Sequence, residues 1–242
     1  MDVRRTALVT GANKGIGFET ARQLAETGVR VHLGARDRAR GEEAARVLAE
    51  RGLDVRFVPL DVRDEATIAA AARTIEGEEG RLDLLVNNAG VASRQDGAPG
   101  ATSLDVVREL LETNFVGAVA VTQAMLPLLL QASAARIVNV SSALGSLSVN
   151  GDPSSPFYTA RALGYNASKA ALNMLTVQLQ AEYGARGVTA VSVSPGFVKT
   201  DLLGGIGAIS AEEGAAVVVR AALDPSTDGA GRHLSAHGVI PW

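Results

Sequence analysis

Short apolar runs alternate with longer amphipathic stretches along the whole chain. Runs such as Ala7-Leu8-Val9 are apolar at consecutive positions, which is typical of strands buried on both faces of a sheet. The stretches between them repeat their apolar positions with helical spacing. The pattern predicts strands at residues 7–10, 30–34, 55–59, 82–87, 136–141, 189–194 and 232–235. It predicts helices at residues 16–28, 38–51, 65–79, 104–132, 164–184 and 211–223.

This alternation predicts an α/β fold with a parallel sheet of about seven strands, right-handed crossovers and helices on both faces. We find no internal repeat and no linker that would divide the chain, so we expect one doubly wound (Rossmann) domain over residues 1–242. Two segments rich in turn-forming residues, 92–101 and 145–161, follow predicted strands. Open α/β sheets bind ligands at the carboxyl ends of their strands, so we expect both segments to border a site.

Composition narrows the function classes. The chain is 47% hydrophobic and 20% charged, as in a folded soluble protein, and its net charge of −3 gives no electrostatic footprint for nucleic acid. It has no Cys, which excludes disulfides and thiolate metal sites. The apolar run behind Arg4 and Arg5 is too short for a signal peptide, and the stretch 115–130 is interrupted by polar residues and Pro127. We therefore expect a cytoplasmic protein that uses no metal, nucleic acid or membrane.

A glycine-rich loop directly follows the first strand and opens the first helix. Gly11, Gly15 and Gly17 permit a tight turn and close backbone approach, and the helix N-terminus offers free N–H groups to a phosphate. This context predicts a dinucleotide site that includes Asn13 and Ile16 of the same loop.

The end of the second strand distinguishes the two nicotinamide dinucleotides. A site for NAD carries an acid there, bonded to the ribose 2′-hydroxyl, whereas an Arg accommodates a 2′-phosphate. This chain has Ala35 at the expected acid position, followed by Arg36, with Arg40 one helical turn on and Lys14 in the glycine loop. The three cations favour NADP(H). If the strand ran two residues further, Asp37 would instead be the acid of an NAD site.

Tyr165 and Lys169 are the strongest catalytic candidates. Residues four apart share one face of a helix, so the phenol and the ammonium become neighbours. A nearby cation favours the ionised phenol, and we therefore expect Lys169 to lower the pKa of Tyr165 toward neutral. Such a phenol can give a proton to a carbonyl oxygen or take one from an alcohol.

Taken together and in order, several motifs resemble those of the short-chain dehydrogenase/reductase family, over nearly the whole chain. Within that family the sequence is most similar to the NADPH-dependent carbonyl reductases, through residues 33–37, residues 113–115 and a short C-terminus that ends at Trp242. The motifs are Thr10-Gly11-x3-Gly15-x-Gly17, Asp61, Asn87-Asn88-Ala89-Gly90, Asn114, Ser142, Tyr165-x3-Lys169 and Pro195-Gly196-x3-Thr200.

The resemblance implies a role for each matching residue. Ser142 would orient the substrate oxygen, Tyr165 would be the general acid/base, and Lys169 would bind the ribose hydroxyls. Asn114 would hold a water that links Lys169 to solvent. Two plainer alternatives stay open: Asn114 as an ordinary polar helix residue, and Ser141 pointing inward in place of Ser142. The implied cofactor contacts are Asp61 and Val62 at the adenine, Asn88, Ala89, Gly90 and Val140 along the dinucleotide, and Pro195, Gly196, Val198 and Thr200 at the nicotinamide.

Two departures from the family leave the substrate open. Ser142 and Tyr165 lie 23 residues apart, about ten more than is usual in the family, and the segment after Thr200 is short and rich in glycine. We expect Leu144, Phe157 and Leu202 to line an apolar substrate pocket. The resulting hypothesis is an NADPH-dependent carbonyl reductase that forms a homodimer or homotetramer, unless residues 148–161 cover the helices and keep it monomeric. The alternatives are an NAD-dependent alcohol dehydrogenase of the same fold and a regulator that binds the dinucleotide without turnover.

Overall fold

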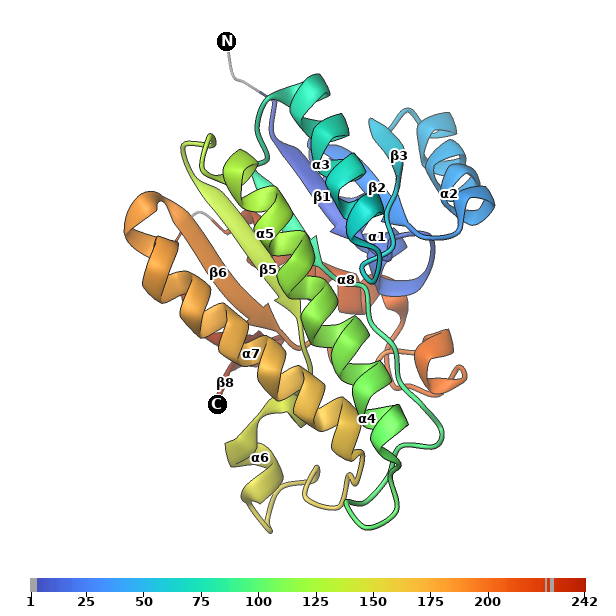
Figure 1. Cartoon of the computed structure of the whole chain (residues 1–242), viewed down its shortest axis with the longest axis vertical. Coiled ribbons are helices and arrows are strands. Elements are labelled where there is room, and N and C mark those ends of the chain that lie inside the picture. Colours follow the sequence, from blue (N-terminus) through green and yellow to red (C-terminus); the bar gives the residue numbers. More distant parts are fainter. Residues whose placement is uncertain (1–3, 225, 227–228) are drawn as a thin grey trace.

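Strands from both ends of the chain join one sheet in the computed structural model, which describes residues 4–224, 226 and 229–242. The eight described strands run in the order β3-β2-β1-β4-β5-β6-β7-β8, and every neighbouring pair is parallel except β7 and β8 (Figure 1). The strands are β1 Thr6–Thr10, β2 Arg30–Ala35, β3 Val55–Pro59, β4 Leu84–Asn87, β5 Ala135–Val140, β6 Val188–Val193, β7 His233–Ser235 and β8 Gly238–Ile240. The predicted doubly wound α/β fold is confirmed.

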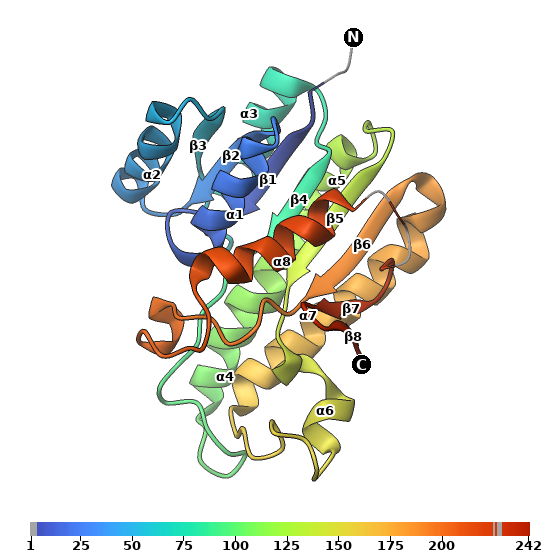
Figure 2. The ribbon, with the colours of Figure 1, turned by 180° about the vertical axis from the view of Figure 1, so that it is seen from behind.

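Helices cover both faces of the sheet. One layer holds α3 Glu65–Glu79, α5 Gly117–Leu129 and α7 Leu163–Tyr183 (Figure 1). The other holds α1 Gly15–Glu26, α2 Arg38–Glu50 and α8 Ala211–Leu223 (Figure 2). Each layer has its own apolar core: Leu24, Leu48 and Val218 belong to one, and Ile75 and Met125 to the other. The remaining helices, α4 Leu104–Leu111 and α6 Leu147–Gly151, lie toward the carboxyl edge of the sheet.

The structure corrects the sequence prediction in three places. The single helix expected over 104–132 is α4, a π-helical segment at Glu112–Val116, and then α5. The extra residue in a π-turn changes which side chains face inward, and Thr113 and Asn114 of this segment are buried. The segment expected to be a loop, 145–161, contains α6. Strand β8 is an eighth strand, antiparallel to β7, that the sequence did not predict. Its three residues are too few to show a periodicity.

The strands end together at one edge. Val9 pairs with Val86, Asn87 with Asn139 and Val140 with Val193, so the carboxyl ends of β1, β4, β5 and β6 are level. The loops that follow the strands carry many of the sequence-predicted site residues, and helix α7 carries Tyr165 and Lys169. Within the described residues, no helix has both the length and the apolar character needed to cross a membrane.

Candidate active site

Helix α7 and the turn after β5 bring Ser142, Tyr165 and Lys169 together. A Cβ on Gly145 would lie 2.7 Å from the backbone carbonyl carbon of Lys169, so glycine there lets the turn pack directly on α7. The Ser142 hydroxyl lies close enough to the Tyr165 phenol to lower its pKa. The Nζ atom of Lys169 lies 5.7 Å from the centre of the Tyr165 ring and donates to the backbone oxygen of Val140 at 2.8 Å.

The expected lowering of the Tyr165 pKa is wrong for this structure. Burial raises the pKa of the phenol to about 12, and the hydrogen bond with Ser142 opposes that rise only in part. Burial also lowers the pKa of Lys169 to about 8. A four-residue spacing makes the two groups neighbours, but desolvation disfavours the charged form of both. Tyr165 is therefore protonated at neutral pH, which is the form that can donate a proton.

The structure distinguishes the two adjacent serines. Ser141 is buried, and its hydroxyl donates to Oδ1 of Asn173 at 2.7 Å, so its role is to join β5 to α7. Ser142 is half-buried, and its Oγ accepts from the N–H of Leu144 at 3.2 Å. Ser142 is thus the serine beside the phenol.

Asn114 connects three segments beneath the site. Its Oδ1 accepts from the N–H of Val91 at 2.8 Å, and its Nδ2 donates to the Val91 oxygen at 2.9 Å and to Ser168 Oγ at 2.9 Å. A Cβ on Gly90 would lie 3.3 Å from this Oδ1 and 3.6 Å from Lys169 Nζ, so Asn114 and Lys169 both border Gly90. Asn114 is therefore more than an ordinary polar helix residue, and the water implied for it stays a prediction.

The glycine loop has the geometry of a phosphate cradle. Gly11 and Gly15 have φ of 62° and 58°, which favours glycine, and a Cβ on Gly11 would lie 2.9 Å from Cα of Ala89. Asn88 donates from Nδ2 to the backbone oxygens of Thr10 at 2.8 Å and of Gly11 at 3.1 Å. The side chain of Asn88 thereby fixes the loop. Gly17 is buried against this amide, and Ile16 packs on the core beside it.

The corner predicted to hold a 2′-phosphate contains two of its three cations in one pocket. Lys14 and Arg40 line a pocket of about 460 Å³ together with Asn13, and Arg36 lies exposed where β2 ends. Asp37 does not extend β2: it is the N-cap of α2, and its carboxylate accepts from the N–H of Arg40 at 3.0 Å. The alternative that made Asp37 an NAD acid depended on a longer strand and is not supported.

Asp201 is a member of this pocket that sequence reasoning missed. It begins the 3₁₀ turn Asp201–Leu203, and its Oδ2 lies 2.8 Å from Nζ of Lys14. The Lys14 ammonium lowers the pKa of Asp201, and Arg40 adds to the effect. The two residues lie 187 positions apart in the chain, so no local pattern could have paired them.

The other predicted cofactor positions lie on the loops of the same edge. Asp61 is half-buried and accepts from the N–H of Arg63 at 3.0 Å. Val62 is buried against Gly117, where a Cβ would stand 2.8 Å from its Cγ2 atom. Pro195 and Gly196 lie one residue beyond the end of β6. Val198 pairs with Ile209 in an isolated bridge, and Thr200 is the N-cap of the turn that begins at Asp201.

The three predicted substrate-pocket residues come from three different segments of the chain. Phe157 lines a hollow of about 340 Å³ with Val149, Pro156 and Pro241, and neither Leu144 nor Leu202 contributes to that hollow. Leu144 is half-buried in the turn after Ser142, whereas Leu202 is 39% exposed in the segment after Thr200. Of the three, Leu144 is the one that lies two residues from Ser142, the predicted catalytic serine.

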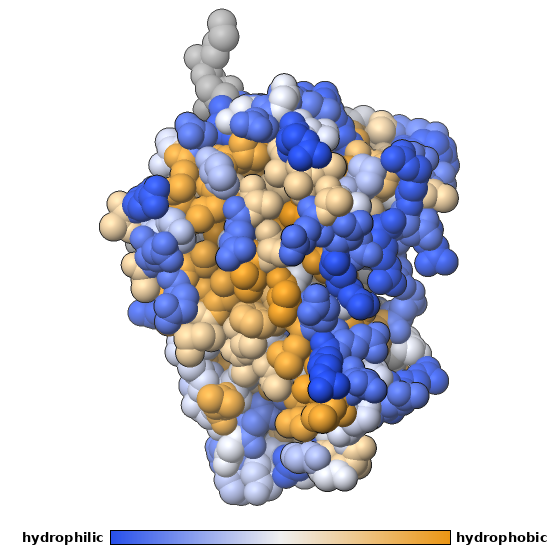
Figure 3. All heavy atoms as spheres, in the orientation of Figure 1, coloured by the Kyte–Doolittle hydropathy of each residue, from blue (hydrophilic) through white to orange (hydrophobic). Residues whose placement is uncertain are grey.

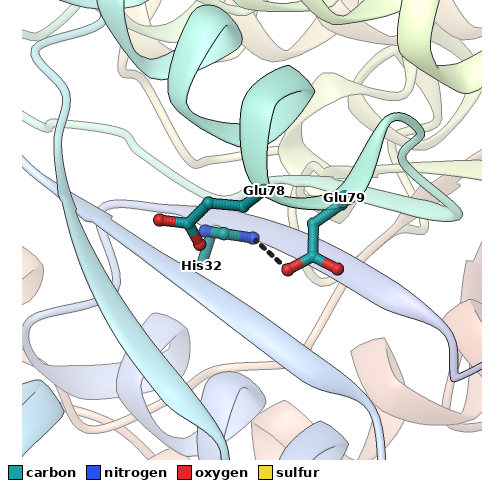
Figure 4. Close-up of side chains that lie close together, drawn as sticks. All are labelled: His32, Glu78 and Glu79. Atoms are coloured by element: carbon teal, nitrogen blue, oxygen red, sulfur yellow. Dashed lines mark ion pairs between the residues drawn. The ribbon is translucent and has the colours of Figure 1, made fainter.

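A separate cluster at the opposite end of the strands contains His32 of β2 and Glu78 and Glu79 of α3 (Figure 4). Their possible ligand atoms lie within 4.8 Å of one another. Each carboxylate already binds a guanidinium, Glu79 that of Arg30 at 2.8 Å and Glu78 that of Arg56 at 2.7 Å. Two such cations oppose the binding of a metal ion, so we interpret the cluster as an ion-pair network that includes a buried neutral His32, whose pKa is lowered by burial.

Comparisons with known proteins agree with this geometry. A family model described as short chain dehydrogenase matches residues 5–208. Short-chain dehydrogenase anuI of Penicillium roqueforti is 38% identical over 227 residues, which cover 90% of this chain and 88% of the relative. The structure of salutaridine reductase from Papaver somniferum superposes with a TM-score of 0.82 at 33% identity, over 95% and 99% of the two chains. NADPH-bound carbonyl reductase from chicken fatty liver gives a TM-score of 0.87 at 31% identity, over 99% of each chain.

Proposed function

Because this chain belongs to the short-chain dehydrogenase family of oxidoreductases, we propose that it is an NADPH-dependent carbonyl reductase. The observation that carries the proposal is the grouping of three side chains: the Ser142 hydroxyl faces the Tyr165 phenol, and the buried ammonium of Lys169 lies 5.7 Å from the centre of the same ring. A protonated phenol held beside an ammonium can give its proton to a carbonyl oxygen, as the reduction of a carbonyl requires.

In the proposed reaction a ketone or aldehyde oxygen accepts hydrogen bonds from Ser142 and Tyr165. Bound NADPH supplies the hydride that the carbonyl carbon receives. Tyr165 gives its proton to the oxygen, which becomes the hydroxyl of the alcohol product, and the phenolate then regains a proton from solvent. Ser142 and Tyr165 act as fixed donors at the place where negative charge develops. Lys169 contributes a positive charge beside the phenolate while that charge exists.

The residues of the sheet edge fit a dinucleotide with a 2′-phosphate. The glycine loop offers backbone N–H groups at the start of α1, and Lys14 and Arg40 share one pocket beside it. Lys and Arg side chains make charge-assisted hydrogen bonds with phosphate. Two of the similar structures support the choice, since one is described as NADPH-bound and one, a gluconate 5-dehydrogenase from Burkholderia cenocepacia, as a complex with NADP and tartrate.

The test is the oxidation of NADPH, followed by its absorbance, with a panel of neutral ketones and aldehydes. We expect turnover with NADPH and much less with NADH. Equal turnover with the two cofactors would favour the NAD-dependent alternative. Tight NADPH binding without turnover of any carbonyl would favour the regulator.

We also propose that the protein forms a homo-oligomer through α5 and α7. Apolar side chains gather over these two helices (Figure 3). Met174 of α7 is 56% exposed. The segment 148–161 does not cover this face: it lies beyond the first turn of α7, where the N–H of Ser148 donates to the oxygen of Trp242 at 3.0 Å (Figure 1). A two-fold dimer brings the same face of each copy together, so a second copy of the chain can cover an apolar face of this kind.

A further inference from the structure

The first turn of α7, which carries Tyr165, is poorly specified by its own sequence. Its N-cap is Ala162, which offers no side-chain cap, and Gly164 occupies the second helical position. Alanine is a weak N-cap and glycine is a weak helix former. Glycine is nevertheless needed there, because a Cβ would lie 2.7 Å from Cδ1 of Leu110 on α4. The position of the catalytic phenol therefore depends on contacts from outside the helix.

Those contacts come from the loop after β4. The N–H of Leu163 donates to the backbone oxygen of Gly97 at 2.9 Å. The N–H of Gly164 donates to Oδ1 of Asp96 at 2.9 Å, and the N–H of Tyr165 donates to Oδ2 of Asp96 at 2.8 Å. The first three amides of the helix are thus all bound by two neighbouring residues that lie 66 to 69 positions away in the chain.

The two residues are themselves held in place. The N–H of Gly97 donates to Thr102 Oγ1 at 2.8 Å, and the N–H of Asp96 donates to the oxygen of Ser93 at 3.2 Å. The loop is therefore an ordered support. It is also one of the two segments expected to border the substrate, so its conformation and that of the proton donor are physically connected.

We propose that Asp96 is a positioning residue for the reaction: its carboxylate, by binding the N–H groups of Gly164 and Tyr165, holds the phenol in the geometry that proton transfer requires. This role rests on the proposed carbonyl reduction. A carboxylate at a helix N-terminus also matches the partial positive charge there, which strengthens both bonds. Asp96 does not touch the substrate in this role; it acts through Tyr165.

The experiment compares Asp96→Ala and Asp96→Asn with Asp64→Asn. Asp64 is a matched control, because it caps α3 by accepting from the N–H of Ala66 at 2.9 Å and its helix carries no predicted site residue. The value of kcat is measured at saturating NADPH and ketone, per NADPH-binding site, together with the Kd of NADPH. Loss of a cap should lower kcat about tenfold in Asp96→Ala. Asp96→Asn should lie between Asp96→Ala and the wild type, because its amide keeps one acceptor oxygen. NADPH Kd should stay within about twofold, and Asp64→Asn should keep the wild-type kcat.

A kcat per binding site that is unchanged in both Asp96 variants, or lowered equally by Asp64→Asn, would overturn the proposal. Hydrogen exchange at the amides of Gly164 and Tyr165 separates this proposal from the proposed function. Exchange should be faster in Asp96→Ala than in the wild type whether or not the wild type reduces ketones. Unchanged exchange would show that Asp96 does not hold the turn, whereas a wild type without turnover would refute the proposed function alone.

Discussion

The proposed 2′-phosphate site predicts that Arg40→Ala weakens the binding of NADPH and leaves that of NADH unchanged. A hydrogen bond to a charged group is worth about 1.5–3 kcal/mol. The Arg40 side chain is 71% exposed and its Nε atom lies 3.5 Å from Asp37, so solvent and an existing partner both reduce its contribution. We expect about 1 kcal/mol, which is about a fivefold increase in the Kd of NADPH. Arg36→Ala should act in the same direction.

Asp201→Asn supplies the opposite perturbation at the same pocket. Its carboxylate lies 2.8 Å from Lys14, so it competes with a phosphate for that ammonium. Removing the charge should tighten NADPH about two- to fivefold. Arg38→Ala is the matched control for Arg40→Ala. Arg38 lies on α2, as Arg40 does, but its guanidinium pairs with Glu42 at 2.9 Å and does not line the pocket.

The assay is titration of nicotinamide fluorescence with NADPH and with NADH at low and at high salt. The selective effects of Arg40→Ala and Asp201→Asn should shrink at high salt, because exposed charges are screened. If either substitution changed the Kd of NADH as much as that of NADPH, the assignment of this pocket to the 2′-phosphate would be refuted.

Three further predictions follow from the site and its surface. The kcat/KM for ketone reduction should fall as pH rises through about 8. Burial lowers the pKa of Lys169 to about 8, so its ammonium is lost above that pH, while Tyr165 keeps its proton. A decline that began only above pH ~9.5 would contradict this prediction. Light scattering should give a mass near twice the 24.9 kDa of the chain or above, and Met174→Lys should lower it, whereas 24.9 kDa for the wild type at micromolar concentration would reject the oligomer. Matched neutral and anionic ketones should differ little in kcat/KM, since apolar walls discriminate by only about 1–3 kcal/mol per methylene. A preference above about 10³ for an anion would indicate a binding group that has been missed. The first candidate for that group is Arg94, whose Nη2 atom lies 2.9 Å from the Cβ position of Gly204.

The sequence predicted best the helices whose ends carry capping residues of their own. The bounds expected for α3 and α8 agree with those observed. Asp64 and Gly80 cap the two ends of α3, and Ser210 and Glu213 form a capping box at the start of α8. Such signals lie within a few residues of the element, so they can be recognised in the sequence.

What the sequence could not predict depends on contacts between distant segments. Nothing within the stretch 104–132 marks the π-helical turn that directs Asn114 inward, because the turn is held by Val91 and Ser168. Asp96 followed by Gly97 resembles an ordinary turn, and only the fold shows that it anchors α7. The spacing of Tyr165 and Lys169 correctly made them neighbours, but the sign of the pKa shift depends on burial, which spacing does not report.

The central claim is that Tyr165 donates the proton in carbonyl reduction. Tyr165→Phe removes only the hydroxyl and leaves the ring beside Lys169, so the fold and the Kd of NADPH should be preserved. Turnover of NADPH with a ketone at saturation should fall by about 10²–10⁴, the usual contribution of a general acid. A Tyr165→Phe variant that binds NADPH normally and keeps a kcat close to the wild-type value would contradict the account.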